Sequence, residues 1–446
     1  MRTIKTRHFT GTTDNTVTKR ELDNRKVARR AAAEGMVLLK NEGQLLPLKE
    51  GSKVALYGVG ASRTIKGGTG SGDVNERETV SIYQGMKNAG FEITTEDWIK
   101  DYDKQYQDAR YAWRDEIENK ASKLEDQVSG FFNVYSTTPF RMPAGAPVTQ
   151  TDADVAIYIL SRIAGEGADR KDEEQDYYIS KKERAMLECL SDCYEHIILL
   201  LNAGGLVDLA FLDEYPKIEA VLNILQPGQE GGNAVADVLL GKKVPSGKLT
   251  DSWAMDYSDY PSAQTFSFKS GDVFHEEYKE GIYVGYRYFD SFDVPVRYGF
   301  GYGLSYTTFE WELLDHSIQI DKDGDVSAKV KVTNTGDKAG KDVVELYYAA
   351  PYLKGEIEKS AVELGDYAKT KLLEPGESEE VTLTISAEDM ASYDENRQCY
   401  VLEDGKYVIR IGNSSRNTVE AATISLDQDV ITEKTENQLR ATKEQL

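Results

Sequence analysis

The first residues of chemical interest are a glutamate and the two glycines beside it. Glu166 stands between Gly165 and Gly167 in SRIAGEGADRKDEE (161–174), directly after the apolar run DVAIYIL (154–160). Glycine permits backbone dihedral angles that other residues avoid, so this carboxylate can project into a cleft. In open α/β sheets, ligands gather outside the carboxyl ends of the strands. The pattern therefore suits a general acid or base at a strand end.

Charged residues lie close to this glutamate in the sequence. Arg162, Asp169 and Arg170 can orient its carboxylate and set its pKa. A solvated charged loop explains an acidic cluster as well, and it is the more common case. On chemistry alone the segment is a candidate catalytic loop, with a plain surface loop as the alternative.

A glycine-rich segment, IKGGTGSGDV (65–74), is a second candidate ligand loop. Gly67 and Gly72 have the spacing of the two glycines of a phosphate-binding P-loop. However, Asp73 takes the place of the lysine and Val74 that of the serine or threonine. A carboxylate at that position repels phosphate. The segment is therefore either a tight turn or a loop for a ligand other than phosphate.

The glycines also fail to form a dinucleotide-binding fingerprint. Gly58 and Gly60 are followed by Arg63, and Gly68 and Gly70 by Asp73, where the fingerprint needs a third glycine. A nucleotide-binding α/β domain is therefore disfavoured.

No residues have the spacing of a metal site. DKDGD (321–325) starts like a calcium loop, but its glycine is in the fourth place rather than the sixth, so we expect a hairpin turn. The histidines have no partner at metal-ligand spacing; they are His8, His196, His275 and His316. We predict neither a metal nor a cofactor.

Composition limits the partners. Acidic residues outnumber basic ones by 76 to 53, and the net charge of −23 repels nucleic acid and anionic lipid but not a neutral sugar. The sequence lacks an apolar run of about 18 residues and the apolar core of a secretory signal. Cys189, Cys193 and Cys399 are too few for a disulfide framework. We expect a cytoplasmic protein that binds neither nucleic acid nor membrane.

The elements that would position these loops alternate between strand and helix over the first 260 residues. Apolar runs of strand length are at 53–58, 154–160, 196–202 and 218–225. Helical patterns are at 25–39, 95–127, 180–195 and 232–240. Strands spaced by helices form βαβ units, hence an α/β domain whose mostly parallel sheet has helices on both faces.

From residue 310 the hydrophobic period changes to two, which predicts an antiparallel β-sandwich. The predicted strands lie within 326–336, 341–351, 379–389 and 405–415. The Tyr-rich stretch before them (278–309) must pack against other parts of the protein, such as an interdomain surface. The end of the chain (431–446) is charged and helix-prone, as in a linker.

Five collinear segments make the chain resemble family 3 glycoside hydrolases of the domain-permuted, bacterial β-glucosidase type. They are AAEGMVLLKNEGQLLPL (32–48), GGTGSGDVN (67–75), GEGADRKD (165–172), QPGQEGGNAVADVLLGKKVPSGKL (226–249) and RYGFGYGLSYTTF (297–309). The sandwich resembles the fibronectin type III-like domain of the same enzymes, with VTNTG (332–336) and VELYYAAP (344–351) as its marks. The resemblance implies an α/β-sandwich domain followed by a fibronectin type III-like domain.

The same resemblance implies a retaining glycosidase that acts on a β-linked glucoside or oligosaccharide. Its Glu acid/base comes from the α/β-sandwich domain, here Glu166, and its Asp nucleophile from a (β/α)8 barrel. Such a pair of carboxyl groups works at about 5–5.5 Å. By resemblance the substrate-binding residues are Thr69, Ser71 and Asp73 of the glycine-rich loop, with Asp169 and Arg170.

The resemblance and the patterns together divide the chain into five parts. We expect an N-terminal arm (1–24), the α/β-sandwich domain (25–260), a Tyr-rich linker (261–309), the fibronectin type III-like domain (310–428) and a linker towards a barrel (429–446).

The barrel itself is not recognisable in the sequence. It takes about 200 residues or more, and the D-S-W of Asp251–Trp253 is in the wrong context for the nucleophile. We therefore expect a fragment or a split enzyme, with the barrel supplied in cis or in trans. A non-catalytic carbohydrate-binding or assembly module is the alternative. An apolar surface left open along 278–306 would favour self-association.

Overall fold

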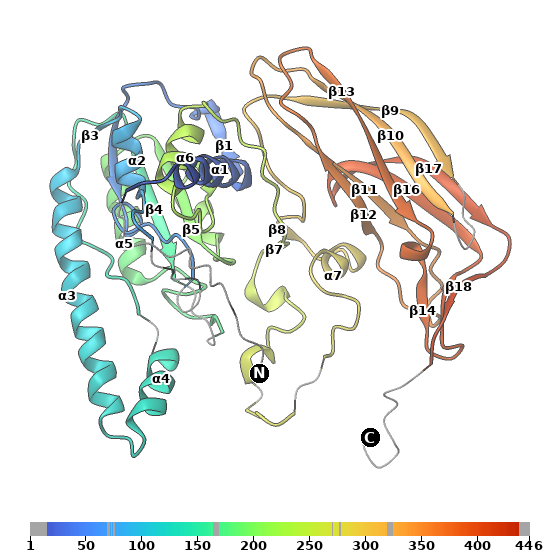
Figure 1. The fold of residues 1–446 in the computed structure, drawn as a ribbon, viewed down its shortest axis with the longest axis horizontal. Helices are drawn as coiled ribbons and strands as arrows, with labels where there is room; N and C mark the ends of the chain where they lie inside the picture. Colours follow the sequence, from blue (N-terminus) through green and yellow to red (C-terminus); the bar gives the residue numbers. More distant parts are fainter. Residues whose placement is uncertain are drawn as a thin grey trace, which may run out of the picture.

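The structure is a computed structural model that describes residues 16–68, 72, 74, 76–138, 140–163, 169–269, 271–275, 278–318 and 324–436. Figure 1 shows an α/β domain and a β-sandwich side by side. Between them lies a segment with the short strands β7 (Trp253–Ala254) and β8 (Val296–Tyr298) and the helix α7 (Tyr286–Ser291).

The α/β domain is built on a six-stranded sheet in the order β1-β6-β5-β4-β2-β3. The strands are β1 (Val37–Asn41), β2 (Lys53–Tyr57), β3 (Glu92–Ile93), β4 (Val155–Arg162), β5 (Ile197–Ala203) and β6 (Ile218–Asn223). Neighbouring strands are parallel except β1, which runs antiparallel to β6. This confirms the predicted mostly parallel sheet.

Alternate residues of the central strand enter two separate cores. Val155, Ile157 and Ile159 of β4 pack in one, and Tyr158 and Leu160 pack in the other. Both faces of the sheet are thus covered, which explains why the strand reads as one continuous apolar run.

Helices cover the sheet and extend beyond it. They are α1 (Lys19–Gly35), α2 (Ile82–Asn88), α3 (Glu96–Ala121), α4 (Gln127–Thr137), α5 (Lys181–Cys193) and α6 (Gly231–Leu239). In Figure 1, α3 runs along the edge of the domain that faces away from the sandwich, with α4 beside its far end. Short 3₁₀ turns are at Glu42–Gln44, Ala210–Asp213, Tyr257–Asp259, Phe266–Phe268 and Glu388–Met390.

The first helix differs from the prediction of 25–39. It begins earlier because Thr18 and Glu21 form a reciprocal capping box. It ends at Gly35, and Val37 begins the strand that pairs with β6. A short apolar run reads equally well as helix or strand, and the tertiary partner decides.

The sandwich consists of two antiparallel sheets, in the orders β13-β10-β9 and β12-β11-β16-β17. Their strands are β9 (Phe309–Ile318), β10 (Asp325–Asn334), β11 (Val343–Ala349), β12 (Glu363–Lys369), β13 (Ser378–Ser386), β16 (Gly405–Ser414) and β17 (Asn417–Leu426). A smaller sheet holds β14 (Ser392–Asp394), β15 (Cys399–Leu402) and β18 (Val430–Lys434). The predicted antiparallel sandwich is confirmed, whereas the helical tendency read at 431–434 is wrong because β18 pairs with β15.

The Tyr-rich stretch packs largely between the two domains. Tyr286 is 7% exposed and lies edge-on to Tyr347 of the sandwich, with 6.5 Å between ring centroids. Arg416 of the sandwich donates to the carbonyls of Phe289 (3.1 Å) and Val294 (2.8 Å). The expected interdomain packing of these aromatic residues is confirmed.

Part of the aromatic surface stays open. Phe274 and Tyr278 are each 88% exposed. Exposed aromatic residues of this kind favour association with another surface. Self-association of the chain remains a prediction.

Candidate active site

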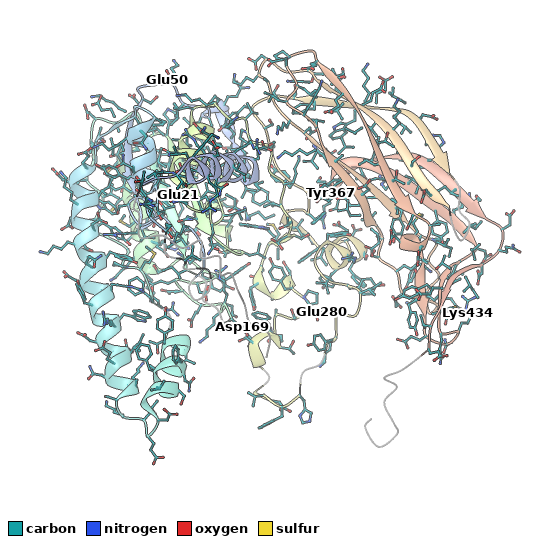
Figure 2. The ribbon with its side chains drawn as sticks, viewed as in Figure 1. Glu21, Glu50, Asp169, Glu280, Tyr367 and Lys434 are labelled. Atoms are coloured by element: carbon teal, nitrogen blue, oxygen red, sulfur yellow. The ribbon has the colours of Figure 1, made fainter. Side chains whose placement is uncertain are left out.

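The loop of Glu166 leaves the carboxyl end of β4. Glu166 lies in 164–168, outside the described residues, so its predicted role is judged from the residues on either side. Ser161 and Arg162 end the strand, and each is 5% exposed. On the far side Asp169 is exposed and marks the lower side of the α/β domain in Figure 2.

Arg162 directs all five of its N–H groups to protein acceptors. Its Nε donates to the carbonyl of Asp176 (2.8 Å), and Nη1 donates to the carbonyl of Ser161 (2.9 Å). The two Nη atoms also donate to Glu183, at 2.6 Å to Oε1 and 3.1 Å to Oε2, and Nη2 reaches the carbonyl of Tyr178 (3.2 Å). The guanidinium is therefore fully satisfied inside the protein.

Arg170, on the other side of the loop, also donates hydrogen bonds to Asp176. Its Nε and Nη2 donate to Asp176, at 2.6 Å to Oδ1 and 2.8 Å to the carbonyl, and Nη1 donates to the carbonyl of Leu206 (2.6 Å). A Cβ atom on Gly205 would lie 3.0 Å from Nη1, so the glycine leaves room for this contact. A contact between Arg170 and substrate stays a prediction.

The glycine-rich loop starts beside the same strand end. Thr69, Ser71 and Asp73 lie outside the described residues, but the loop's first residue, Ile65, is held by the buried Asn202 at the end of β5. The Asn202 Oδ1 accepts from the Ile65 amide (2.7 Å), and Nδ2 donates to its carbonyl (2.9 Å). The same Oδ1 accepts from Ser161 Oγ (3.2 Å). One amide thus links the starts of both candidate loops.

The two glycines that follow β2 have a packing role. Gly58 has φ of +97°, and a Cβ atom there would lie 2.2 Å from the Ile159 carbonyl oxygen. A Cβ on Gly60 would lie 2.4 Å from Ser161 Oγ. The glycines allow this segment to lie directly against β4. This packing role is consistent with the absence of a dinucleotide-binding fingerprint at Gly58 and Gly60.

A small cavity of about 60 Å³ lies at the end of β4. It is lined by Phe140, Arg141, Ser161, Arg162, Ile163 and Asp176, among others. Ligand pockets usually measure about 300–1,000 Å³. The hollow that these residues form is therefore, by itself, too small for a sugar.

Burial shifts the pKa values of two groups near this edge. Burial raises the pKa of Tyr178, whose carbonyl receives Arg162. Burial also raises the pKa of the Asp208 carboxyl, although an amide hydrogen bond from Ala210 and the charge of Arg297 act in the opposite direction. Both groups therefore favour their neutral forms more than exposed groups would.

Sequence reasoning missed Asp176, Glu183 and Asn202. Glu183 had a signal, because Ser180 and Glu183 have capping-box spacing and form that box at the start of α5. Asn202 is a polar residue at the end of an apolar run, which hints at a structural role. Asp176 has no signal, since its partners Arg162 and Arg170 are defined only by the fold.

Within the described ranges, no three His, Cys, Asp or Glu side chains are grouped so that they could hold a metal ion. In the same part of the chain, no helix has the length and apolar character needed to cross a bilayer.

A mostly parallel α/β sheet with a glycine-flanked acidic loop at a strand end, followed by an antiparallel sandwich, defines the class. Residues 36–286 match the glycosyl hydrolase family 3 C-terminal domain, and residues 342–415 match a fibronectin type III-like domain. The chain therefore belongs to glycosyl hydrolase family 3, as its motifs predicted. The first match continues beyond residue 260 into the Tyr-rich stretch.

Several of the proteins to which the chain is similar are named as β-glucosidases, and two others as exo-alpha-(1->6)-L-arabinopyranosidases. The chain is 37% identical to beta-glucosidase A of Butyrivibrio fibrisolvens over 92% of its own length and 52% of that protein. It superposes on a beta-glucosidase of Paenibacillus barengoltzii with a TM-score of 0.80 at 35% identity, covering 92% of this chain and 44% of that one. For beta-glucosidase 3B of Thermotoga neapolitana in complex with alpha-D-glucose, the TM-score is 0.76, the identity 38% and the coverage 92% and 55%. The chain thus spans about half the length of these relatives.

Proposed function

We propose that this chain supplies the general acid/base of a retaining β-glucosidase, with Glu166 as that residue. Its nucleophile would come from a (β/α)8 barrel, joined to the chain or acting as a separate polypeptide. The observation that carries the proposal is the place of Glu166 in a family 3 domain, between Arg162 at the end of β4 and Arg170. Both arginines donate a hydrogen bond to the carbonyl of Asp176, which follows the loop in the sequence.

The chemistry requires two carboxyl groups on opposite sides of the glycosidic bond. One attacks the anomeric carbon, while the other protonates the leaving oxygen and later removes a proton from water. The second carboxyl group is proposed to lie outside this chain, because the chain spans only 52% of beta-glucosidase A and 44% of the Paenibacillus barengoltzii enzyme.

The substrate proposed is a β-linked glucoside or oligosaccharide. The names of relatives such as beta-glucosidase A support this class, and a relative of known structure holds glucose. Thr69, Ser71 and Asp73 are proposed to hydrogen-bond sugar hydroxyls, since their loop starts beside the end of β4. Asp169 and Arg170 are proposed to contact the sugar from the other loop.

We also propose a cytoplasmic location. Cys189, Cys193 and Cys399 are all free thiols in the structure, which suits a reducing compartment. The acidic net charge of −23 supports neutral partners over nucleic acid or membrane.

The proposal is tested with an aryl β-glucoside. The chain is assayed alone, with a family 3 barrel polypeptide, and as a fusion to that barrel. Hydrolysis only when the barrel is present is the expected result. No hydrolysis in any pairing would support a non-catalytic carbohydrate-binding or assembly module instead.

The role of Glu166 is tested by Glu166→Gln in the active pairing. With a poor leaving group, kcat/KM should fall by about 10²–10⁴-fold, the usual contribution of general acid/base catalysis. With a good leaving group, which needs little protonation, the loss should be much smaller. Equal losses with both substrates would contradict the assignment.

A further inference from the structure

Asp176 lies in a compact turn that follows the Glu166 loop and leads into α5. The Asp176 amide donates to the carbonyl of Glu173 (3.2 Å), and the Tyr178 amide donates to the same carbonyl (3.1 Å). Gln175 has φ of +67°, a value that non-glycine residues rarely adopt. The fold therefore keeps a costly backbone conformation directly before Asp176.

Asp176 receives both ends of the loop. Its carbonyl oxygen accepts from Arg162 Nε and from Arg170 Nη2, each at 2.8 Å. Its carboxylate accepts from Arg170 Nε (2.6 Å) at Oδ1 and from the Lys171 amide (2.7 Å) at Oδ2. Arg162 comes just before the loop and Arg170 just after it, so one residue joins the two sides.

The anchor is itself rigidly held. Arg162 forms a buried two-point ion pair with Glu183, and the Glu183 Oε2 also accepts from the Ser180 amide (2.7 Å) at the start of α5. Arg170 is further tied to the carbonyl of Leu206 after β5. The loop ends are thus connected to α5 and to the neighbouring strand.

We propose that Asp176 is the positioning residue of the general acid/base, because its carbonyl and carboxylate together fasten Arg162 and Arg170 at the two ends of the loop that carries Glu166. The inference rests on the proposed function of Glu166. Proton transfer to a leaving oxygen requires the acid within hydrogen-bond reach, so a misplacement of about 1 Å costs on the order of 10²-fold in rate.

The same turn offers a matched control. Glu173 belongs to the turn, and its exposed carboxylate pairs with Arg141 rather than with either end of the loop. Asp176→Asn and Glu173→Gln are the same chemical change, from carboxylate to amide. Only Asp176→Asn weakens the hydrogen bond from Arg170 Nε to the side chain of residue 176. It also places the new amide N–H opposite the N–H of Lys171.

The test measures kcat/KM for aryl β-glucosides of graded leaving-group ability, in the active pairing of chain and barrel. For a poor leaving group, Asp176→Asn should lower kcat/KM by about 10–100-fold. For a dinitrophenyl glucoside, the loss should be less than about threefold, because departure then needs little protonation. Glu173→Gln should leave both values unchanged.

A merely structural role would lower kcat/KM equally for all leaving groups, and that result would overturn the inference. A double variant adds a second criterion. If Asp176 acts through Glu166, Asp176→Asn should cost nothing further in the Glu166→Gln background. A full additional loss in that background would also overturn it.

Failure of the proposed function is recognised separately. Amide hydrogen exchange over 163–171 requires no activity and should be faster in Asp176→Asn than in the unchanged chain or Glu173→Gln, at equal melting temperature. If Glu166→Gln shows no leaving-group dependence, the proposed function fails, and this exchange alone decides whether Asp176 holds the loop. If Asp176→Asn does not fold, Asp176→Glu, whose longer side chain displaces the carboxylate from the Arg170 Nε and from the Lys171 amide, is measured in its place with the same expected results. Unchanged exchange and unchanged leaving-group dependence would refute the inference.

Discussion

Arg162 and Glu183 form a two-point ion pair inside the α/β domain. Nη1 lies 2.6 Å from Oε1, and Nη2 lies 3.1 Å from Oε2. The two side chains are only 5% and 8% exposed. The pair connects the end of β4 with the start of α5, and it therefore supports the loop that lies between these elements.

Glu183→Gln should strongly destabilise the chain. The change leaves the buried guanidinium without a counter-charge, which costs about 3–5 kcal/mol. Glu173→Gln is the control, because it breaks an exposed ion pair with Arg141, worth about 0–1 kcal/mol. Urea unfolding measures both free energies, and equal losses would show that the buried pair has no special weight.

A second buried carboxyl, Glu345 in the sandwich, predicts a pH effect on stability. Burial raises the pKa of Glu345 from 4.5 to about 7, although a hydrogen bond from Tyr347 Oη (2.6 Å) and the charge of Lys248 lower it. Asp342 acts in the same direction as burial. The close approach of Gly301, where a Cβ would lie 2.7 Å from Oε2, helps to exclude water.

The sign follows from proton binding. Since the folded pKa exceeds the unfolded one, the folded state holds the proton more tightly, and this stabilisation is complete below about pH 4.5. It is lost as the pH rises through about 7, by roughly 3 kcal/mol in all. Glu345→Gln keeps an acceptor for Tyr347 and should flatten the decline in unfolding free energy between pH 5 and pH 8. An unchanged slope in the variant would assign the decline to other groups.

Much of the fold could be predicted because of how it is buried. The strands β4, β5 and β6 are covered on both faces, so their sequences are continuous apolar runs bounded by polar residues. The edge strand β1 and the short β18 were not predicted. Residues 37–39 and 431–434 were predicted as helical, and they become strands only through pairing with β6 and β15.

The candidate site was predictable in part for a similar reason. Glu166 is recognised from a local motif, G-E-G after an apolar run, that the sequence displays directly. Asp176 and Glu183 act through Arg162, and no local pattern records which arginine the fold will bring to them. The residues that hold a site in place are defined by tertiary contacts, whereas the reactive residue can be recognised from a local sequence motif.

Gly58→Ala should destabilise the fold far more than the same change at Gly90, another glycine with a positive φ. Both Gly58 and Gly90 have a positive φ, which costs alanine about 1–2 kcal/mol. At Gly58 the new Cβ would also lie 2.2 Å from the Ile159 carbonyl oxygen, whereas at Gly90 no described atom lies within 4 Å. The clash should add about 1–3 kcal/mol. Thermal unfolding of the two variants compares them directly, and equal losses would contradict the packing role.

The last prediction concerns Asn202 and the glycine-rich loop. Asn202 is fully buried, and its Nδ2 donates to the carbonyls of Ile65 (2.9 Å) and Leu225 (2.8 Å). Asn202→Asp keeps the shape but turns both donors into an acceptor, so the buried Ile65 carbonyl loses its partner at about 1–3 kcal/mol, and the part-buried Leu225 carbonyl loses its bond as well. The variant should be destabilised most at neutral pH and partly recover in acid, where the new carboxyl is protonated and can donate one bond.

The same variant tests whether the glycine-rich loop binds the sugar. Because Asn202 holds the loop at Ile65, a displaced loop should raise KM for an aryl β-glucoside more than it lowers kcat. Ser161→Ala is the control, since it removes a bond to the same Asn202 oxygen (3.2 Å) without touching the loop. Steady-state kinetics of the active pairing, at a temperature where both variants are folded, gives the comparison. An unchanged KM in Asn202→Asp would mean that Thr69, Ser71 and Asp73 do not contact the substrate and that the loop is only a turn.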